Sequence, residues 1–253
     1  MSEFAVSFIA YLCVMGGALV GIYLHRVLPP DHMKDDTREI VNVAIGLIAT
    51  LSALVLGLMV ASAKSSFDAR SEEVRESGAR IIMIDRSLRQ YGPETRDTRE
   101  LLRQLTAARI KRVWGEPGDP AQEGVVGTQA AGIEAVRSQL FALTPGNETQ
   151  RWLHARALTL LVELEQAHWL LIEQSRSSIP TPFLVVLVLW LAIIFASLGL
   201  FAPRNPTVYT IIFVCALSVA TAVFLILEMD HPFEGLLQIP DAPLRSALAE
   251  MNR

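Results

Sequence analysis

Four long stretches without any charged side chain restrict the folds open to this chain more than any other feature of its sequence. They cover Phe4–Leu24, Val41–Ala63, Phe183–Ala202 and Val208–Leu227, and none contains Asp, Glu, Lys, Arg or His. Each holds about 20 residues, which as a helix crosses the roughly 30 Å hydrocarbon core of a bilayer. Because a helix satisfies its own backbone hydrogen bonds in lipid, we expect four transmembrane helices.

Charge is concentrated between the second and third stretches. Residues 64–182 hold 16 of the chain's 22 Lys and Arg residues and 16 of its 26 Asp and Glu residues, whereas the flanks are nearly free of charge. This segment is therefore expected to be an aqueous domain. We predict transmembrane helices 1 and 2 within residues 1–63, the inserted domain over 64–182, helices 3 and 4 within 183–227, and a C-terminal tail over 228–253.

The inserted segment has the pattern of an all-α bundle. The second apolar stretch continues past Ala63 with good helix formers and without proline before Pro93, which predicts one helix that runs out of the membrane. Tyr91-Gly92-Pro93 is expected to end it. Further helices are predicted over Thr95–Trp114, over Thr128–Leu143, and from an N-capping Asn147 to about Ser177.

Small residues recur in the first two membrane stretches and allow close approach of helices, either within one subunit or between subunits. They are Gly16, Gly17, Gly21, Gly46, Ala49, Ser52 and Ala53.

Motifs for enzymatic chemistry are absent from the sequence. It has no nucleophile elbow, phosphate-binding loop or zinc-ligand spacing, and its two cysteines lie in apolar stretches. The net charge of -4 provides no basic surface for nucleic acid. We therefore expect neither an enzyme nor a bound cofactor or metal. The uncharged membrane stretches also argue against a proton-coupled transporter, which usually needs an ionisable group inside the bilayer.

Two groups of residues are candidates for an ion pathway. Thr50, Leu54 and Leu58 share one face of the second membrane helix and would form stacked rings in a symmetric oligomer; apolar rings of this kind can gate by dewetting. Alternatively, the face contacts lipid or another helix. Glu228 and Asp230 follow the fourth membrane stretch beside a rigid Pro232, which suggests contact with an ion or, alternatively, a solvated helix end.

Three motifs, in their order along the chain, resemble those of the bestrophin family. The closest likeness is to the bacterial bestrophin-like domain proteins, whose function is unknown. The motifs are Val55-Leu56-Gly57-Leu58 with Phe67-Asp68-Ala69-Arg70, then Ile179-Pro180-Thr181-Pro182-Phe183, then Glu228-Met229-Asp230-His231-Pro232-Phe233 with Asp241-Ala242-Pro243-Leu244.

The resemblance implies a homopentameric channel, mostly anion-selective, so chloride is the first expectation for the permeant ion. It implies a multi-pass protein of a bacterial inner membrane with the helical domain in the cytoplasm; the distribution of Lys and Arg does not decide the orientation. It assigns the pore neck to Thr50, Leu54 and Leu58, and ion contact or gating to Glu228, Asp230, Pro232 and Phe233.

Departures from the family pattern limit what the resemblance implies. Leu58 stands where the family has an aromatic neck residue, and Glu234 replaces the glycine after Pro-Phe. The acidic run of the calcium clasp is replaced by Gly235-Leu236-Leu237-Gln238, so calcium gating is not expected. The alternative hypothesis is a membrane-anchored sensory or interaction protein whose helical domain binds a partner.

Overall fold

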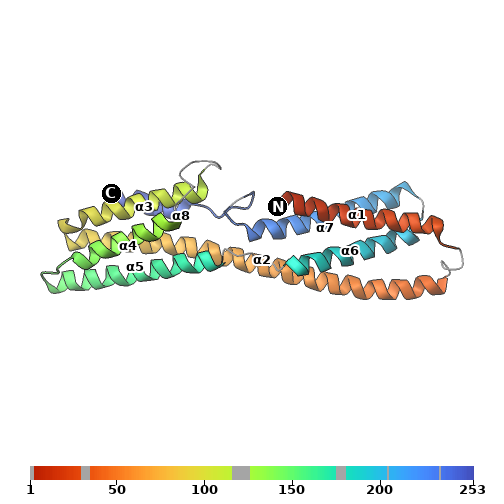
Figure 1. The fold of residues 1–253 in the computed structure, drawn as a ribbon, viewed down its shortest axis with the longest axis horizontal. Coiled ribbons are helices and arrows are strands. Elements are labelled where there is room, and N and C mark those ends of the chain that lie inside the picture. Colours follow the sequence, from red (N-terminus) through yellow and green to blue (C-terminus); the bar gives the residue numbers. More distant parts are fainter. Residues whose placement is uncertain (1–2, 30–34, 116–125, 175–180, 204, 234) are drawn as a thin grey trace. The chain divides into compact units, whose positions relative to one another are not determined.

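The computed structural model describes residues 3–29, 35–115, 126–174, 181–203, 205–233 and 235–253. The predicted all-α fold is confirmed, since these residues contain helices and no strand (Figure 1). The helices are α1 Glu3–Val27, α2 Asp35–Tyr91, the short 3-10 helix η2 Pro93–Thr95, α3 Arg96–Trp114, α4 Val126–Ala142, α5 Glu148–Gln174, α6 Thr181–Phe201, α7 Pro206–Asp230 and α8 Ala242–Met251.

Four of these helices are long and apolar enough to cross a membrane, as the sequence predicted. They are α1, α6, α7 and the first part of α2. The prediction that α2 continues without interruption is also confirmed, because it extends to Tyr91 as one helix. Gly92 then adopts a φ of 143°, which favours glycine, and Pro93 begins the next turn.

The chain forms two compact units, and the division between them falls within α2. The membrane unit comprises Met1–Phe67 and Ser177–Leu237. The bundle unit comprises Asp68–Arg176 and Gln238–Arg253.

Backbone contact between α1 and α6 holds the membrane unit together. A Cβ atom added at Gly17 or Gly21 would overlap the backbone of Ala192 or Ala196, and one added at Gly199 would overlap the carbonyl oxygen of Ala18. The pairs Gly17/Gly21 and Ala192/Ala196 therefore form a small-residue interface, in which close helix approach replaces side-chain interdigitation.

The core of the membrane unit draws on one face of α2 as well as on α1, α6 and α7. Met59 and Ala63 of α2 are buried in it, and Val55 and Leu56 pack against its edge. The other core residues are Val14, Ala18, Leu187, Leu191, Phe195, Ile212, Ala216 and Ile226.

The bundle unit packs the second part of α2 with α3, α4 and α5. The second part of α2 buries an apolar stripe of Val74, Ile81, Ile84 and Leu88. Asn147 caps α5 as predicted, since its Oδ1 accepts a hydrogen bond of 2.8 Å from the backbone N–H of Gln150. The predicted end of this helix near Ser177 lies outside the described residues.

The sequence predicts only a tail over residues 228–253, whereas the bundle unit includes helix α8 in this segment. Leu244, Ala247 and Met251 of α8 are buried. The indole Nε1 of Trp114 donates a hydrogen bond of 2.7 Å to the carbonyl oxygen of Ile239, just before the helix. The helical spacing of Leu244, Ala247 and Met251 after Pro243 is the sequence signal from which this helix could have been predicted.

Candidate pore-lining face and the loop after the fourth span

The predicted pore stripe lies on an exposed face of α2. Leu54 is 60% exposed and Leu58 is 62% exposed, and Thr50 is exposed too. The Thr50 hydroxyl donates a hydrogen bond of 2.8 Å to the carbonyl oxygen of Gly46, which keeps this polar group satisfied along the helix. The described part of the chain therefore leaves most of the stripe uncovered.

The exposed face extends beyond the three predicted residues. Toward the start of α2 it continues through Ile40, Val43 and Leu47, all strongly exposed and spaced three or four positions apart. Only 11% of the most apolar part of α2 is buried, compared with 28% in α1 and in α7. Of the four spans, α2 thus leaves the largest share of its apolar surface to be covered from outside the protomer.

Two glycines in the apolar part of α2, Gly46 and Gly57, differ from Gly17 of α1. A Cβ added at Gly46 or Gly57 would meet no described atom within 4 Å, whereas one at Gly17 would overlap α6. Packing inside the protomer therefore does not require glycine at either α2 position. Both positions would allow a helix outside the protomer to approach closely.

The loop after α7 is organised around the buried carboxylate of Glu228. This carboxylate accepts a hydrogen bond from the backbone N–H of Leu236 and a second, of 3.3 Å, from that of Leu237. Gly235, which directly precedes Leu236, adopts a φ of 83°, and a Cβ there would overlap the Glu228 carboxylate. Glu228 is only 2% exposed, so its carboxylate is directed into its own loop.

The other candidates in this loop lie beside Glu228. Asp230 and Pro232 are buried, and Phe233 is half-buried, whereas His231 is exposed. Their predicted contact with ions stays a prediction. The geometry shows a tight turn in which the buried Glu228 carboxylate accepts hydrogen bonds from the backbone amides of Leu236 and Leu237.

Replacing Glu228 with alanine should open this loop. Two backbone donors would lose their acceptor, at a cost of about 1–3 kcal/mol for each one that stays buried. We expect faster amide hydrogen exchange at Leu236 and Leu237 in the full chain. The Glu228→Gln variant keeps an acceptor oxygen, so the amides of Leu236 and Leu237 should exchange much more slowly in it than in Glu228→Ala. Equal exchange rates of these amides in the wild type and in Glu228→Ala would contradict the role of Glu228 as their acceptor.

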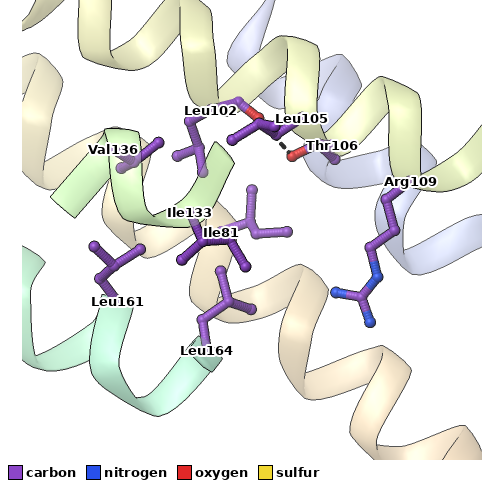
Figure 2. Close-up of a pocket in the computed structure, with 9 residues that line it drawn as sticks. All are labelled: Ile81, Leu102, Leu105, Thr106, Arg109, Ile133, Val136, Leu161 and Leu164. Carbon is purple, nitrogen blue, oxygen red and sulfur yellow. Dashed lines mark hydrogen bonds between the residues drawn. The ribbon is translucent and has the colours of Figure 1, made fainter. Parts of the chain in front are cut away.

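The bundle unit contains a small apolar cavity of about 30 Å³, shown in Figure 2. Its one charged neighbour, Arg109, lies at the edge of the apolar cluster, and burial lowers the pKa of its guanidinium, partly opposed by Glu73. The Thr106 hydroxyl bonds to the carbonyl oxygen of Leu102. A space of this size holds about one water molecule and is too small for a ligand.

Metal ligands do not gather in the described part of the chain. No three His, Cys, Asp or Glu residues there are placed to hold one ion. Glu228 and Asp230 thus lack a third described carboxylate, thiolate or imidazole with which to form a metal site.

Comparison with known proteins supports the family resemblance. The model of the bestrophin-like domain family matches residues 12–244. No curated protein matches the sequence significantly.

Among solved structures, the crystal structure of a mutant bacterial bestrophin homologue from Klebsiella pneumoniae is similar over 100% of both chains. The TM-score is 0.59 and the sequence identity is 12%, so this similarity shows the fold. The chain is therefore an all-α membrane protein with the bestrophin fold, and it belongs to the bestrophin-like domain family.

Proposed function

We propose that this protein is the subunit of an oligomeric ion channel in which α2 lines the pore. The observation that carries the proposal is the apolar, uncovered face of α2, with Leu54 and Leu58 both about three-fifths exposed. Around a symmetry axis the same face of each copy would point toward the axis, and together these faces would surround a pore. Family membership supports a channel of the bestrophin type.

The chemistry of the pore follows from its lining. Thr50 would contribute a ring of hydroxyl groups, and Leu54 and Leu58 would contribute two apolar rings. Apolar rings hold water poorly, so the narrowest of them would form the gate. The four spans contribute no Asp, Glu, Lys, Arg or His to the hydrocarbon region, which favours passive flow over coupled transport and over enzymatic catalysis.

The finer features of the proposal are a homopentamer, an anion such as chloride as the permeant ion, and a bacterial inner membrane with the helical domain in the cytoplasm. The family resemblance supports all of them. A native mass measurement on the purified protein addresses the first, because a ring of subunits is required for a pore on the symmetry axis. A monomer or a dimer would contradict the channel.

The second candidate is a membrane-anchored interaction protein. Phe141 and Trp152 on the bundle unit are 66% and 61% exposed, and large exposed aromatic side chains are common where a partner binds. This function requires no pore and no ring of subunits.

Reconstitution in liposomes distinguishes the two functions. We expect the wild-type protein to give chloride flux above that of empty vesicles. The Leu54→Ala substitution should change this flux about tenfold, which is equivalent to about 1.4 kcal/mol in the free-energy barrier to permeation. Leu217→Ala is the matched control, because Leu217 is exposed on α7 outside the stripe. Wild-type flux equal to that of empty vesicles, with Leu54→Ala also silent, would overturn the channel proposal.

A further inference from the structure

A groove of about 350 Å³ lies where α1, α2 and α6 meet in the membrane unit. This volume lies within the range of about 300–1,000 Å³ found for ligand sites. Its lining is almost entirely apolar, with Ser197 supplying the one side-chain hydroxyl. Representative lining residues are Val20, Leu24, Ile40, Ala44, Ala196 and Leu200.

The groove is hollow because small residues line it between larger ones. Gly21, Ala44 and Ala196 leave the space, while Ile40 and Val20 at the rim remain 71% and 53% exposed. The backbone contact of Gly21 with Ala196 fixes the distance between α1 and α6. The groove is thus built by the helix packing itself, and a flexible apolar chain can fill it without rearrangement.

A histidine and two arginines lie near one end of this groove. The imidazole Nδ1 of His25 lies 2.8 Å from the carbonyl oxygen of Leu200, a lining residue. The guanidinium carbon of Arg38 lies 5.7 Å from the ring centre of Phe201, the next residue along α6. Arg26, in the last turn of α1, follows His25 directly.

Acidic groups accompany these cations on α2. Asp36 and Glu39 flank Arg38 in the sequence, and both are exposed. The end of the groove therefore carries both signs of charge, whereas its length is apolar. A molecule that matches this pattern has a long hydrocarbon chain and a headgroup with a phosphate and an ammonium.

We propose that the groove is a binding site for a zwitterionic glycerophospholipid such as phosphatidylethanolamine. One acyl chain occupies the groove, and the headgroup phosphate lies at Arg38 and Arg26. The ammonium group is matched by Asp36 and Glu39. The site is a property of the membrane unit, and it does not depend on whether the protein conducts ions.

Photo-cross-linking tests this site on the purified full chain. The probe is a phosphatidylethanolamine with a diazirine on one acyl chain, and the labelled peptides are identified by mass spectrometry. We expect labels on α1, α2 and α6 residues of the groove, and about one retained phospholipid per subunit in native mass spectra. Labels spread evenly over all four spans, with no retained lipid, would overturn the proposal.

Filling the groove provides the matched comparison. Ala44→Phe places a ring inside it and should reduce retained lipid by about tenfold, because the acyl chain and the ring compete for one volume. Ala53→Phe lies on the opposite face of α2, at about 3.6 residues per turn, and should retain lipid as wild type does. Equal retention by Ala44→Phe and wild type would contradict the site.

A variant that removes a charge tests the site independently of the bulky Ala44→Phe substitution. Arg38→Gln leaves the groove open and should lower retention of the probe severalfold, whereas Arg75→Gln in the bundle unit should leave it unchanged. If a benzophenone side chain at position 44 cross-links to a second copy of the chain instead of to lipid, a neighbouring subunit fills the groove and the proposal is wrong.

Discussion

Replacing Gly21 with alanine is expected to destabilise the membrane unit strongly, and Gly17→Ala should act in the same direction. At both positions the new methyl group would overlap backbone atoms of α6, which cannot rotate away as a side chain can. Overpacking a well-packed interior usually costs about 1–3 kcal/mol. Because here a whole helix must move, we expect the upper end of this range for Gly21→Ala, measured as a lower unfolding temperature of the full chain in detergent.

Gly16 provides the control within the same helix. A Cβ there would meet no described atom within 4 Å, so Gly16→Ala has no packing cost. Alanine also favours a helix by up to about 1 kcal/mol over glycine. Gly16→Ala should therefore match or exceed the wild-type unfolding temperature. If Gly16→Ala and Gly21→Ala behaved alike, the α1–α6 interface would be wrong.

Replacing Asp85 with alanine is the second change with a large expected effect, this time in the bundle unit. The Asp85 carboxylate is 2% exposed and accepts hydrogen bonds from Arg89 at 2.9 Å and from Arg99 at 2.7 Å. It thereby links α2 to α3. Losing one partner of a buried pair typically costs about 3–5 kcal/mol. Both arginines keep some solvent exposure, so we expect about 2–3 kcal/mol, measured by chemical unfolding of the full chain.

Glu72 is the matched comparison for Asp85. It forms an ion pair of 2.6 Å with Arg75 on the same helix, but both side chains are largely exposed. The hydrogen bond from Arg75 lowers the pKa of Glu72, yet an exposed pair adds little to stability because water competes for both groups. Glu72→Ala should therefore change the free energy of unfolding much less than Asp85→Ala; equal effects would show that Asp85 is not a structural acceptor.

The sequence predicted the helices well because their signals are local. Apolar length marked the four spans, the absence of proline before Pro93 predicted the long α2, and Asn147 identified the start of α5. Helix α8 was missed because its apolar positions, Leu244, Ala247 and Met251, occupy only a short segment near the C-terminus. A pattern of this length is weak without the surface that it covers.

The sequence did not predict which residues of one helix or loop contact another. Gly16 and Gly17 are adjacent and chemically identical, yet only Gly17 touches α6. Similarly, Glu228 was identified as a candidate for ion contact, and its carboxylate accepts hydrogen bonds from Leu236 and Leu237 in its own loop. That bond depends on the positive φ of Gly235, which a sequence pattern does not specify.

The exposed stripe on α2 is the basis of the proposed pore, and thiol accessibility tests it most directly. Cys13 and Cys215 are both exposed, so both would first be replaced with alanine. Leu54→Cys would then be introduced on α2, and Leu217→Cys on α7 as the control. Channels in liposomes would be exposed to a charged, water-soluble thiol reagent while chloride flux is recorded. We expect chloride flux through the Leu54→Cys variant to fall to the level of empty vesicles, and flux through the Leu217→Cys variant to stay unchanged. Unchanged flux in fully modified Leu54→Cys would contradict a pore lined by α2.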